Sequence, residues 1–456
     1  MFLVQFLRFL VCEFRKIAMR LQKKSMLRVK HNHTEIGSEI SKLICRVVGL
    51  RTFVDDVIAV KYLKQLESIC ISYNILPNGF SQDPRVTPSK WTTTKSILYL
   101  SLMTINIIRL ILLSCFNLPD KWHLLLGDFF YGHKNGRLFW LFFLNASIFG
   151  EVFRHFWIYL IEKKQWESFK FEQIVYSKGF KSQVLCMDLF YCRKLRFFVT
   201  NLAIFWVRIL YCASISFAPI LILIVHSMYK LPHTLEKYIY TGFWLVISYL
   251  GFVCVISNLL LIGSVNTIQL CYFYFKVAHV TQSVHNLALN RSQSNNANYF
   301  LEYKATIREI IRYQNEIEQA NISIRNLFIF TYLGISFVDD FGIYSAVFVH
   351  IDRGFMDFFI VNAAMIGLVT TAACSYTNGV LLAKMNSCCK NLRKATKHLQ
   401  LNVQAFIKVT DLEDRLSRTD IAFTMGTMLD LTTRIFVIYL LENICLIMMF
   451  EINFRK

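Results

Sequence analysis

The sequence predicts an all-α membrane protein with seven transmembrane helices and an inverted topology, in which the N-terminus lies inside the cell. Hydrophobic residues make up 55% of the 456 residues, above the roughly 45 to 50% that is usual in soluble domains. The apolar residues form long runs, and about 20 of them are enough for a helix to cross a hydrocarbon core. Since backbone polar groups in lipid must bond within a helix or a closed barrel, runs of this length predict helices.

The first segment, residues 1–95, is expected to be a cytoplasmic N-terminal region with amphipathic helices. It begins with a short apolar stretch that Arg8 and Glu13 interrupt. Basic residues follow this stretch, whereas a secretory signal carries its positive charge before the apolar core. The pattern favours a helix that lies on the membrane surface.

Seven apolar segments are long enough to span a bilayer. They run from Ser96 to Phe116, Leu138 to Ile161, Phe197 to Met228, Tyr238 to Gly263, Asn326 to Val349, Phe358 to Ala383, and Leu431 to Phe450. The chain is thereby divided into transmembrane helices 1 to 4 (96–263), a cytoplasmic helical hairpin (264–325), helices 5 and 6 (326–383), cytoplasmic anchor helices (384–430), and a pore-type helix 7 with a short extracellular C-terminus (431–456).

The distribution of basic residues predicts the orientation of the chain. Of its 50 Lys and Arg residues, 38 lie in the alternate segments 1–95, 162–196, 264–325 and 384–430, and 8 lie in the segments between them and at the C-terminus. Cytoplasmic loops carry the excess of Lys and Arg in membrane proteins. The N-terminus is therefore expected inside and the C-terminus outside, the reverse of a G-protein-coupled receptor.

The long inside segments are expected to be helical. Apolar residues recur there at spacings of three and four, which is typical of one face of a helix; they are Leu270, Phe273, Val277, Val280, Val284 and Leu287 in one stripe, and Ile307, Ile310, Ile317 and Ile324 in another. The two stripes predict an antiparallel hairpin. Thr410 with Glu413 forms a capping-box pattern, which predicts the start of a third helix.

Gly426 and the pair Leu429–Asp430 precede the last span. Together with the seven spans, the inside N-terminus and the long inside segments, they resemble the insect gustatory and odorant receptor superfamily. The mark of that family in its last span is a Gly and a short apolar stretch that ends in Leu-Asp or Leu-Asn; here the stretch is one residue shorter. The second half of that mark, Thr-Tyr followed later by Gln, does not match. The sequence thus resembles a divergent gustatory receptor or gustatory-receptor-like protein.

The resemblance implies a ligand-gated, non-selective cation channel of the plasma membrane, built as a homo- or hetero-tetramer of related subunits. It implies a small-molecule tastant or odorant-like ligand, held among spans two, three, four and six, and no cofactor. The seventh helices would line the pore. Ile447 would form an apolar constriction, Phe450 would take the place of the polar filter, and Glu451 would form a carboxylate ring just outside it.

Ionisable residues inside the predicted spans are candidates for ligand contacts or for structural ion pairs, because charges at membrane depth generally face the bundle and pair there. Arg109 is one of them. The others are Glu151, Arg154, His155, Arg208, Asp339 and Asp340. Their depths predict that Glu151 pairs with Arg208 and Asp339 with Arg109.

Aromatic residues near the outer ends of the spans could line a pocket for a small apolar ligand, or serve only in packing and lipid contact. They are Phe139, Trp140, Phe142, Phe143, Phe217, Trp244, Phe359 and Tyr376.

Other classes of protein are disfavoured by absent motifs. The sequence has no phosphate-binding glycine loop, His-Glu metal motif or nucleophile elbow, which argues against an enzyme. The 13 Cys show no metal-ligand or disulfide spacing, and the net charge of +20 belongs to inside loops rather than to a nucleic-acid surface. A transporter and a non-conducting seven-span protein with a non-sensory role stay open as alternatives.

Overall fold

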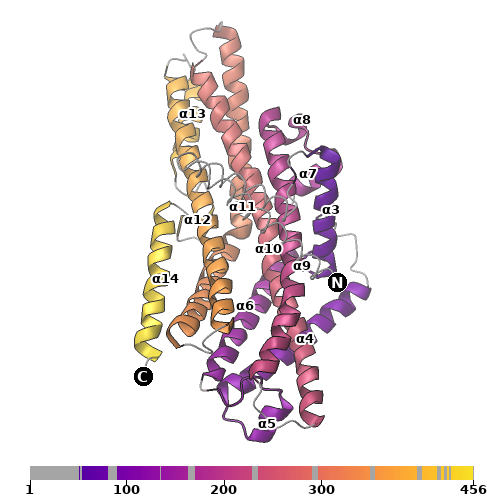
Figure 1. Ribbon diagram of the computed structural model, residues 1–456. Helices are drawn as coiled ribbons and strands as arrows, with labels where there is room; N and C mark the ends of the chain where they lie inside the picture. Colours follow the sequence, from indigo (N-terminus) through magenta and orange to yellow (C-terminus); the bar gives the residue numbers. More distant parts are fainter. Residues whose placement is uncertain are drawn as a thin grey trace, which may run out of the picture.

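A computed structural model shows a long bundle of α-helices (Figure 1). The structure describes residues 51, 54–80, 90–133, 135–162, 170–228, 235–289, 296–349, 355–397, 403–418, 423–425, 429–430 and 433–454. The helices predicted within residues 1–50, and Gly426, lie outside these residues. In Figure 1, α5 and the C-terminus lie at the lower end of the bundle and α13 at the upper end; these are called the α5 end and the α13 end.

The elements follow one another along the chain as helices with one small sheet. Their bounds are α3 Asp56–Ser72, α4 Lys90–Cys115, α5 Asp120–Leu125, α6 Gly136–Glu162, α7 Lys170–Lys178, α8 Ser182–Leu185, α9 Leu189–Met228, α10 Leu235–Leu289, α11 Asn296–Tyr344, a π-helical turn η3 Ser345–Val349, α12 Phe355–Thr396, α13 Val403–Ser417, β1 Thr424–Met425, β2 Leu429–Asp430 and α14 Thr433–Phe454.

Within the described residues, five helical segments are long and apolar enough to cross a membrane: Thr93–Cys115, Gly136–Glu162, Leu189–Ala218, Leu235–Leu289 and Asn298–Val349. They contain, in whole or in large part, the first five predicted spans. The sixth predicted span lies within α12, and α14 contains the seventh from Thr433 onward. Apolar side chains on α4, such as Ile97, Leu98 and Ile108, are exposed, as a helix that faces lipid requires. The chain is an all-α membrane protein.

Two hydrophobic clusters fill the bundle. The larger one joins α3, the last turns of α6, the first turns of α9, and the long extensions of α10, α11 and α12 toward the α13 end. The segment 117–133, which contains α5, is called the α5 loop. The smaller cluster, named here the α5-end cluster, joins α4, the α5 loop, the start of α6, the last turns of α9 and the neighbouring turns of α11 and α12. Helix α3 shows how the larger cluster forms, because Ala59, Leu63, Leu66 and Cys70 make one apolar face and are all fully buried.

The first predicted apolar stripe of the inside segments is buried, and so is the second except for the half-buried Ile307. The helices that carry both stripes are continuous with the spans. α10 has 55 residues and α11 has 49. An ion pair between Lys276 and Glu316 joins the two helices, and the ring of Phe273 packs edge-on against Tyr313. The hairpin thus extends the membrane helices instead of forming a separate unit.

The predicted start of the third inside helix at Thr410 is wrong. α13 begins at Val403, and the Thr410 hydroxyl donates a hydrogen bond to the Phe406 carbonyl one turn earlier within the helix. A threonine followed by glutamate fits a helix interior as well as a cap, since its hydroxyl can bond the preceding turn. The helix instead packs through Val409, Leu412 and Leu416, which are buried.

A two-stranded antiparallel sheet precedes α14. Thr424 pairs with Asp430 and Met425 with Leu429, so the Leu429–Asp430 pair of the motif lies in β2. The sheet is tied to α11 because Asn321 Oδ1 accepts a hydrogen bond from the Thr424 amide at 2.9 Å. Leu429 and Asp430 therefore help to set the position at which α14 enters the bundle.

Candidate functional site

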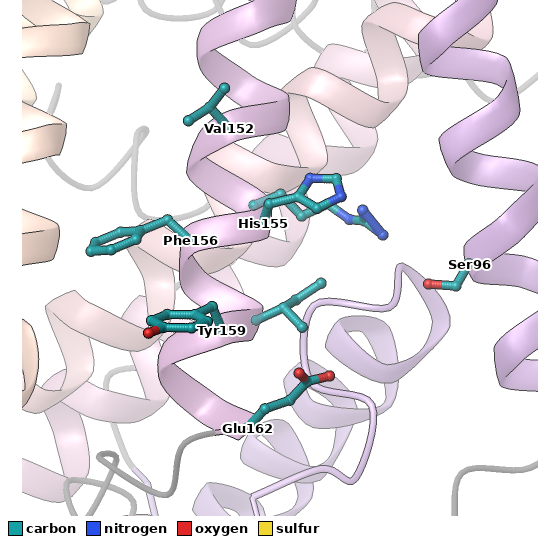
Figure 2. A pocket seen from close by; sticks show the side chains of 8 residues that line it. Ser96, Val152, His155, Phe156, Tyr159 and Glu162 are labelled. Atoms are coloured by element: carbon teal, nitrogen blue, oxygen red, sulfur yellow. The ribbon is translucent and has the colours of Figure 1, made fainter.

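An open groove of about 630 Å³ runs along α6 beside the first turns of α4. The residues that line it are Ser96, Val152, Arg154, His155, Phe156, Ile158, Tyr159 and Glu162. Figure 2 shows His155 on the side of α6 that faces Ser96, whereas Phe156 and Tyr159 point away from Ser96. Polar and apolar side chains thus share the groove.

Two of the predicted intramembrane polar residues, Arg154 and His155, line this groove, and both contact a third, Glu151. Oε1 of Glu151 lies 3.4 Å from Arg154 Nη1 and 3.2 Å from His155 Nδ1. Arg154 is buried, and its guanidinium carbon lies 4.1 Å from the centroid of the Tyr99 ring on α4. Glu151 finds its basic partners one turn away on its own helix, so the expected pairing with Arg208, which is exposed on α9, is wrong.

Arg109 of α4 is only 1% exposed. Its Nε donates to the Leu126 carbonyl at 2.7 Å, its Nη2 to the Gly127 carbonyl at 2.8 Å, and its Nη1 to the Ser248 hydroxyl at 2.8 Å. The expected pairing with Asp339 is wrong as well, because these donors are directed to the α5 loop and to α10. Arg109 therefore fastens the α5 loop to the helices beneath it.

Three aromatic rings surround this guanidinium. Its carbon lies 5.2 Å from the ring centroid of Phe129 and 4.9 Å from those of Trp140 and Trp244. A cation over an aromatic face within about 6 Å gains about 2 kcal/mol or more when desolvated. These three residues are called the Arg109 cage. The sequence predicted Trp140 and Trp244 as pocket or packing residues and Arg109 as a ligand contact or structural ion-pair partner, but it did not predict that they contact one another.

Asp128 holds the α5 loop to α6 and also links residues within the loop. Its Oδ1 accepts hydrogen bonds from Trp140 Nε1 at 2.8 Å and from the Phe130 amide at 3.0 Å, and its Oδ2 lies 2.7 Å from His123 Nδ1. Trp244 Nε1 donates to the Leu125 carbonyl at 2.7 Å. The loop is thus held over the α5-end cluster by polar contacts on both sides.

The predicted aromatic set is largely brought together in this cluster. Phe139, Trp140, Phe142 and Phe217 are buried in it, and Phe143 and Trp244 pack against it. Tyr376 lies elsewhere, exposed on α12, and the side chain of Phe359 lies outside the described residues. The gathered rings come from α6, α9 and α10, and side chains of α4, α11 and α12 complete the cluster.

Helix α14 has one exposed and one buried face. The exposed face is mostly apolar, with Glu442 and Asn453 as its polar residues among the described side chains. Its apolar residues are Val437, Ile438, Leu441, Ile444, Met448, Met449 and Ile452, with the thiol of Cys445 among them. The predicted pore residues Ile447, Phe450 and Glu451 are instead half-buried. Phe450 packs its ring against Phe341 and Tyr344 of α11, with centroids 5.9 and 5.7 Å away. Its ring is therefore turned toward its own subunit.

The buried face of α14 is attached through hydroxyl groups. The Tyr439 hydroxyl lies 2.6 Å from the Thr371 hydroxyl of α12 and accepts a hydrogen bond from Ser336 of α11 at 2.9 Å. One turn nearer the α13 end, the hydroxyls of Tyr332 and Ser375 lie 2.5 Å apart. We call these five residues the hydroxyl cluster. Sequence reasoning missed it, although Tyr332 and Ser336, and likewise Thr371 and Ser375, are spaced by four.

Asp339 and Asp340 lie next to the hydroxyl cluster. Asp339 is 6% exposed and Asp340 is fully buried. Asp339 Oδ2 and both oxygens of Asp340 have no hydrogen-bond partner, and no ion pair in the described part of the chain involves either residue. The Asp339 carboxylate lies so close to Gly367 that a Cβ there would be 2.2 Å from Oδ2.

Comparisons with known proteins give the fold. No family model matches the sequence, and no curated protein sequence matches it closely. The structure is similar to that of an olfactory receptor of the insect Machilis hrabei, OR5, solved in complex with eugenol. The two share 10% sequence identity, with a TM-score of 0.59 over 87% of this chain and 100% of the receptor.

Proposed function

We propose, from this insect olfactory receptor fold, that the protein is a divergent member of the insect chemoreceptor superfamily, a small-molecule receptor that acts as a ligand-gated cation channel. The observation that carries the proposal is the combination of a capped aromatic cluster at the α5 end with a terminal helix whose exposed face is apolar. The first feature is suited to a small ligand and the second to assembly around an axis.

The α5-end cluster is the proposed ligand site. Ligand sites are mostly apolar and aromatic, with a few polar groups that fix orientation. Phe139, Phe142 and Phe217 supply apolar surface, while Asp128 and Arg109 lie at the loop that covers them. The similar receptor was solved with eugenol, and a small apolar or aromatic molecule is the class of ligand we propose here.

The exposed face of α14 is the proposed pore and subunit contact in a homo- or hetero-tetramer. Apolar constrictions gate ion pathways by dewetting, and Leu441, Ile444 and Met448 recur along this face at spacings of three and four. Phe450 is not placed in the ion path in this proposal, because its ring packs on α11. Glu451 stays a proposed carboxylate near the end of the path.

In this arrangement the N-terminus and the α13 end lie in the cytoplasm, and the α5 end with the C-terminus lies outside the cell. The excess of basic residues in the predicted inside segments supports this orientation. The α5-end cluster is then accessible to ligands from the exterior. A taste-type role and the plasma membrane as the location follow from the resemblance to gustatory receptors.

A non-conducting role is the second candidate. The observation that favours it is the apolar character of the exposed face of α14, on which Glu442 and Asn453 are the exposed polar residues among the described side chains. A face of this kind fits packing against lipid or another helix as well as it fits a gate. A recording experiment separates the two.

The native thiol of Cys445 provides the test, since it is exposed in the middle of α14. The protein is expressed alone and with related receptor subunits, and currents are recorded during application of small aromatic ligands. A water-soluble thiol reagent should change the current of the wild-type channel and leave that of Cys445→Ser unchanged. Cys212→Ser, which removes an exposed thiol of α9, is the control and should keep the wild-type response. Absence of current with every ligand and subunit, in protein that reaches the cell surface, would favour the non-conducting role.

A further inference from the structure

The contact region of α11, α12 and α14 contains several buried acceptor oxygens that have no hydrogen-bond partner. Besides Asp339 and Asp340, Asn443 of α14 is 4% exposed. Its Nδ2 donates to the Tyr439 carbonyl at 2.6 Å, and its Oδ1 has no partner. Buried polar atoms without partners are rare in native structures and require an explanation.

The contacts between the helices place the residues that carry these oxygens at one level of the bundle. Ser336 bonds Tyr439, and on α11 Asp340 follows Ser336 by four residues, so it lies one turn farther toward the α5 end on the same face. Asn443 follows Tyr439 by four residues on α14, which runs in the same direction. Asp340 and Asn443 therefore lie at the same level, one helical turn from the hydroxyl cluster toward the α5 end.

Helix α12 reaches this level as well. It runs in the opposite direction, and Gly367 lies one turn from Thr371 toward the α5 end. The carboxylate of Asp339 packs directly on Gly367. Both carboxylates also lie within electrostatic range of the Tyr439 hydroxyl. The turn of α14 that carries Asn443 is thus at the level of the two carboxylates, and the hydroxyls of Ser336, Thr371 and Tyr439 border this level one turn away.

Charge decides what this site can hold. Two neighbouring carboxylates repel each other, and an unpaired buried charge costs several kcal/mol. In the described residues no three His, Cys, Asp or Glu side chains gather as a metal-binding group, so nitrogen and sulfur ligands for a transition metal are not gathered here. Carboxylate, amide and hydroxyl oxygens are instead the ligands of hard cations.

We propose that Asp339, Asp340 and Asn443, with the bordering hydroxyls, bind a hard cation, Na⁺ or Ca²⁺, that fixes α14 to α11 and α12. The cation neutralises the carboxylates and draws on the oxygens that the protein leaves without donors. Its binding stabilises one packing of α14, whether or not the helix lines a conducting pore. The inference therefore stands independently of the proposed channel activity.

The test measures thermal unfolding of the purified full-length protein in nanodiscs at constant ionic strength, with choline chloride replaced stepwise by NaCl, and separately with CaCl₂ added or EGTA present. One of the two cations should raise Tm by at least about 2 to 4 °C. Asp339→Asn and Asp340→Asn should lose this rise. Glu442→Gln removes a carboxylate from the exposed side of α14 and should retain it.

The NaCl and CaCl₂ series identify the cation. Ser336→Ala is included as a milder variant, in case the aspartate variants fail to fold. This variant removes a single hydroxyl of the proposed site and should increase the cation concentration needed for half of the Tm shift. Three results would overturn the proposal: no response to either cation, an equal response in the aspartate variants, or stabilisation only by lowering the pH, which would mean that protons alone neutralise the two carboxylates.

Discussion

The guanidinium of Arg109 and the indole of Trp244 face each other between α4 and α10, with the guanidinium carbon 4.9 Å from the ring centroid. Trp244 also touches the α5 loop, since a Cβ on Gly127 would lie 2.9 Å from the Trp244 ring. Gly127 has a φ of +58°, a conformation that glycine adopts without strain. Arginine, tryptophan and glycine thus form one joint between the loop and the bundle.

Replacement of Arg109 by Met should loosen the α5 loop. The variant loses hydrogen bonds to the carbonyls of Leu126 and Gly127, and charged hydrogen bonds are worth about 1.5 to 3 kcal/mol each. We expect a loss of roughly 3 kcal/mol in stability, measured as a lower Tm in nanodiscs. Lys121→Met, at an exposed position on α5, should change Tm little. An unchanged Tm in Arg109→Met would show that the contacts of Arg109 do not hold the loop.

Gly334→Ala should destabilise the contact between α11 and α6. A Cβ at Gly334 would lie 2.0 Å from the ring of Phe149, which is itself buried, and overpacking of this kind costs typically about 1 to 3 kcal/mol. Gly263→Ala is the matched control, because a Cβ there meets nothing within 4 Å. Alanine is favoured over glycine inside helices by about 1 kcal/mol, so the control should be neutral or slightly more stable. Equal Tm values for the two variants would contradict the close packing.

The ion pair of Lys276 and Glu316 should couple α10 to α11. Lys276 is almost fully buried, with side-chain exposures of 4% for Lys276 and 32% for Glu316, and removal of one partner of a buried pair costs about 3 to 5 kcal/mol. Glu316→Leu alone should lower Tm strongly, because it removes the counter-charge of the buried ammonium and leaves the Tyr272 hydroxyl as its remaining side-chain partner in the described residues. The double variant Lys276→Met with Glu316→Leu should recover much of the loss. A double variant as unstable as the sum of the two single variants would rule out direct coupling.

Stability should fall as the pH rises because of Glu172 on α7. Its carboxylate is buried and both of its oxygens lack partners, and this burial raises the pKa from 4.5 to about 8. The folded state then holds a proton that the unfolded chain has lost, so the stabilisation is complete below pH 4.5 and is lost as the pH rises through about 8. Glu172→Gln should flatten the dependence of Tm on pH over this range, and Glu318→Gln, at an exposed site, should not. Identical curves for Glu172→Gln and the wild type would exclude this assignment.

The orientation predicted from charge has a chemical test. Asn32 and Asn290 begin glycosylation acceptor patterns that the proposed topology places inside the cell, where such acceptors stay unmodified. Treatment with a glycosidase should therefore leave the electrophoretic mobility unchanged. An epitope added after Lys456 should bind antibody on intact cells. Glycan on Asn290, or an epitope reached only after permeabilisation, would reverse the orientation.

The length of the apolar runs and the spacing of apolar residues predicted the helices well, because both are local features of the chain. The stripe from Leu270 to Leu287 is buried as its spacing indicates. The partners of the charged residues were not predictable in this way. Depth alone suggested that Glu151 faces Arg208, whereas the rotation of α6 directs it to Arg154 and His155. The rotation of a helix about its axis depends on all the helices packed against it, so the spacing of its residues in the sequence does not predict it.

The same reason explains the position of Phe450. Alignment to a motif fixed its distance along α14 but not the side of the helix from which the ring leaves. Contacts with Phe341 and Tyr344 decide that side. The polar residues on the buried face could have been found, since Tyr439 and Asn443 are spaced by four in an otherwise apolar helix and so share one face.

The unbroken course of α10 has a mechanical consequence. At about 1.5 Å per residue, its 55 residues form a rod of roughly 80 Å that starts near the joint at Trp244 and continues past Lys276. Because every residue from Leu235 to Leu289 is helical, a small pivot of the first turns displaces the far end by a larger distance. Ser248, which accepts a hydrogen bond from Arg109, and Lys276, which pairs with Glu316 of α11, both lie on α10 and therefore move together.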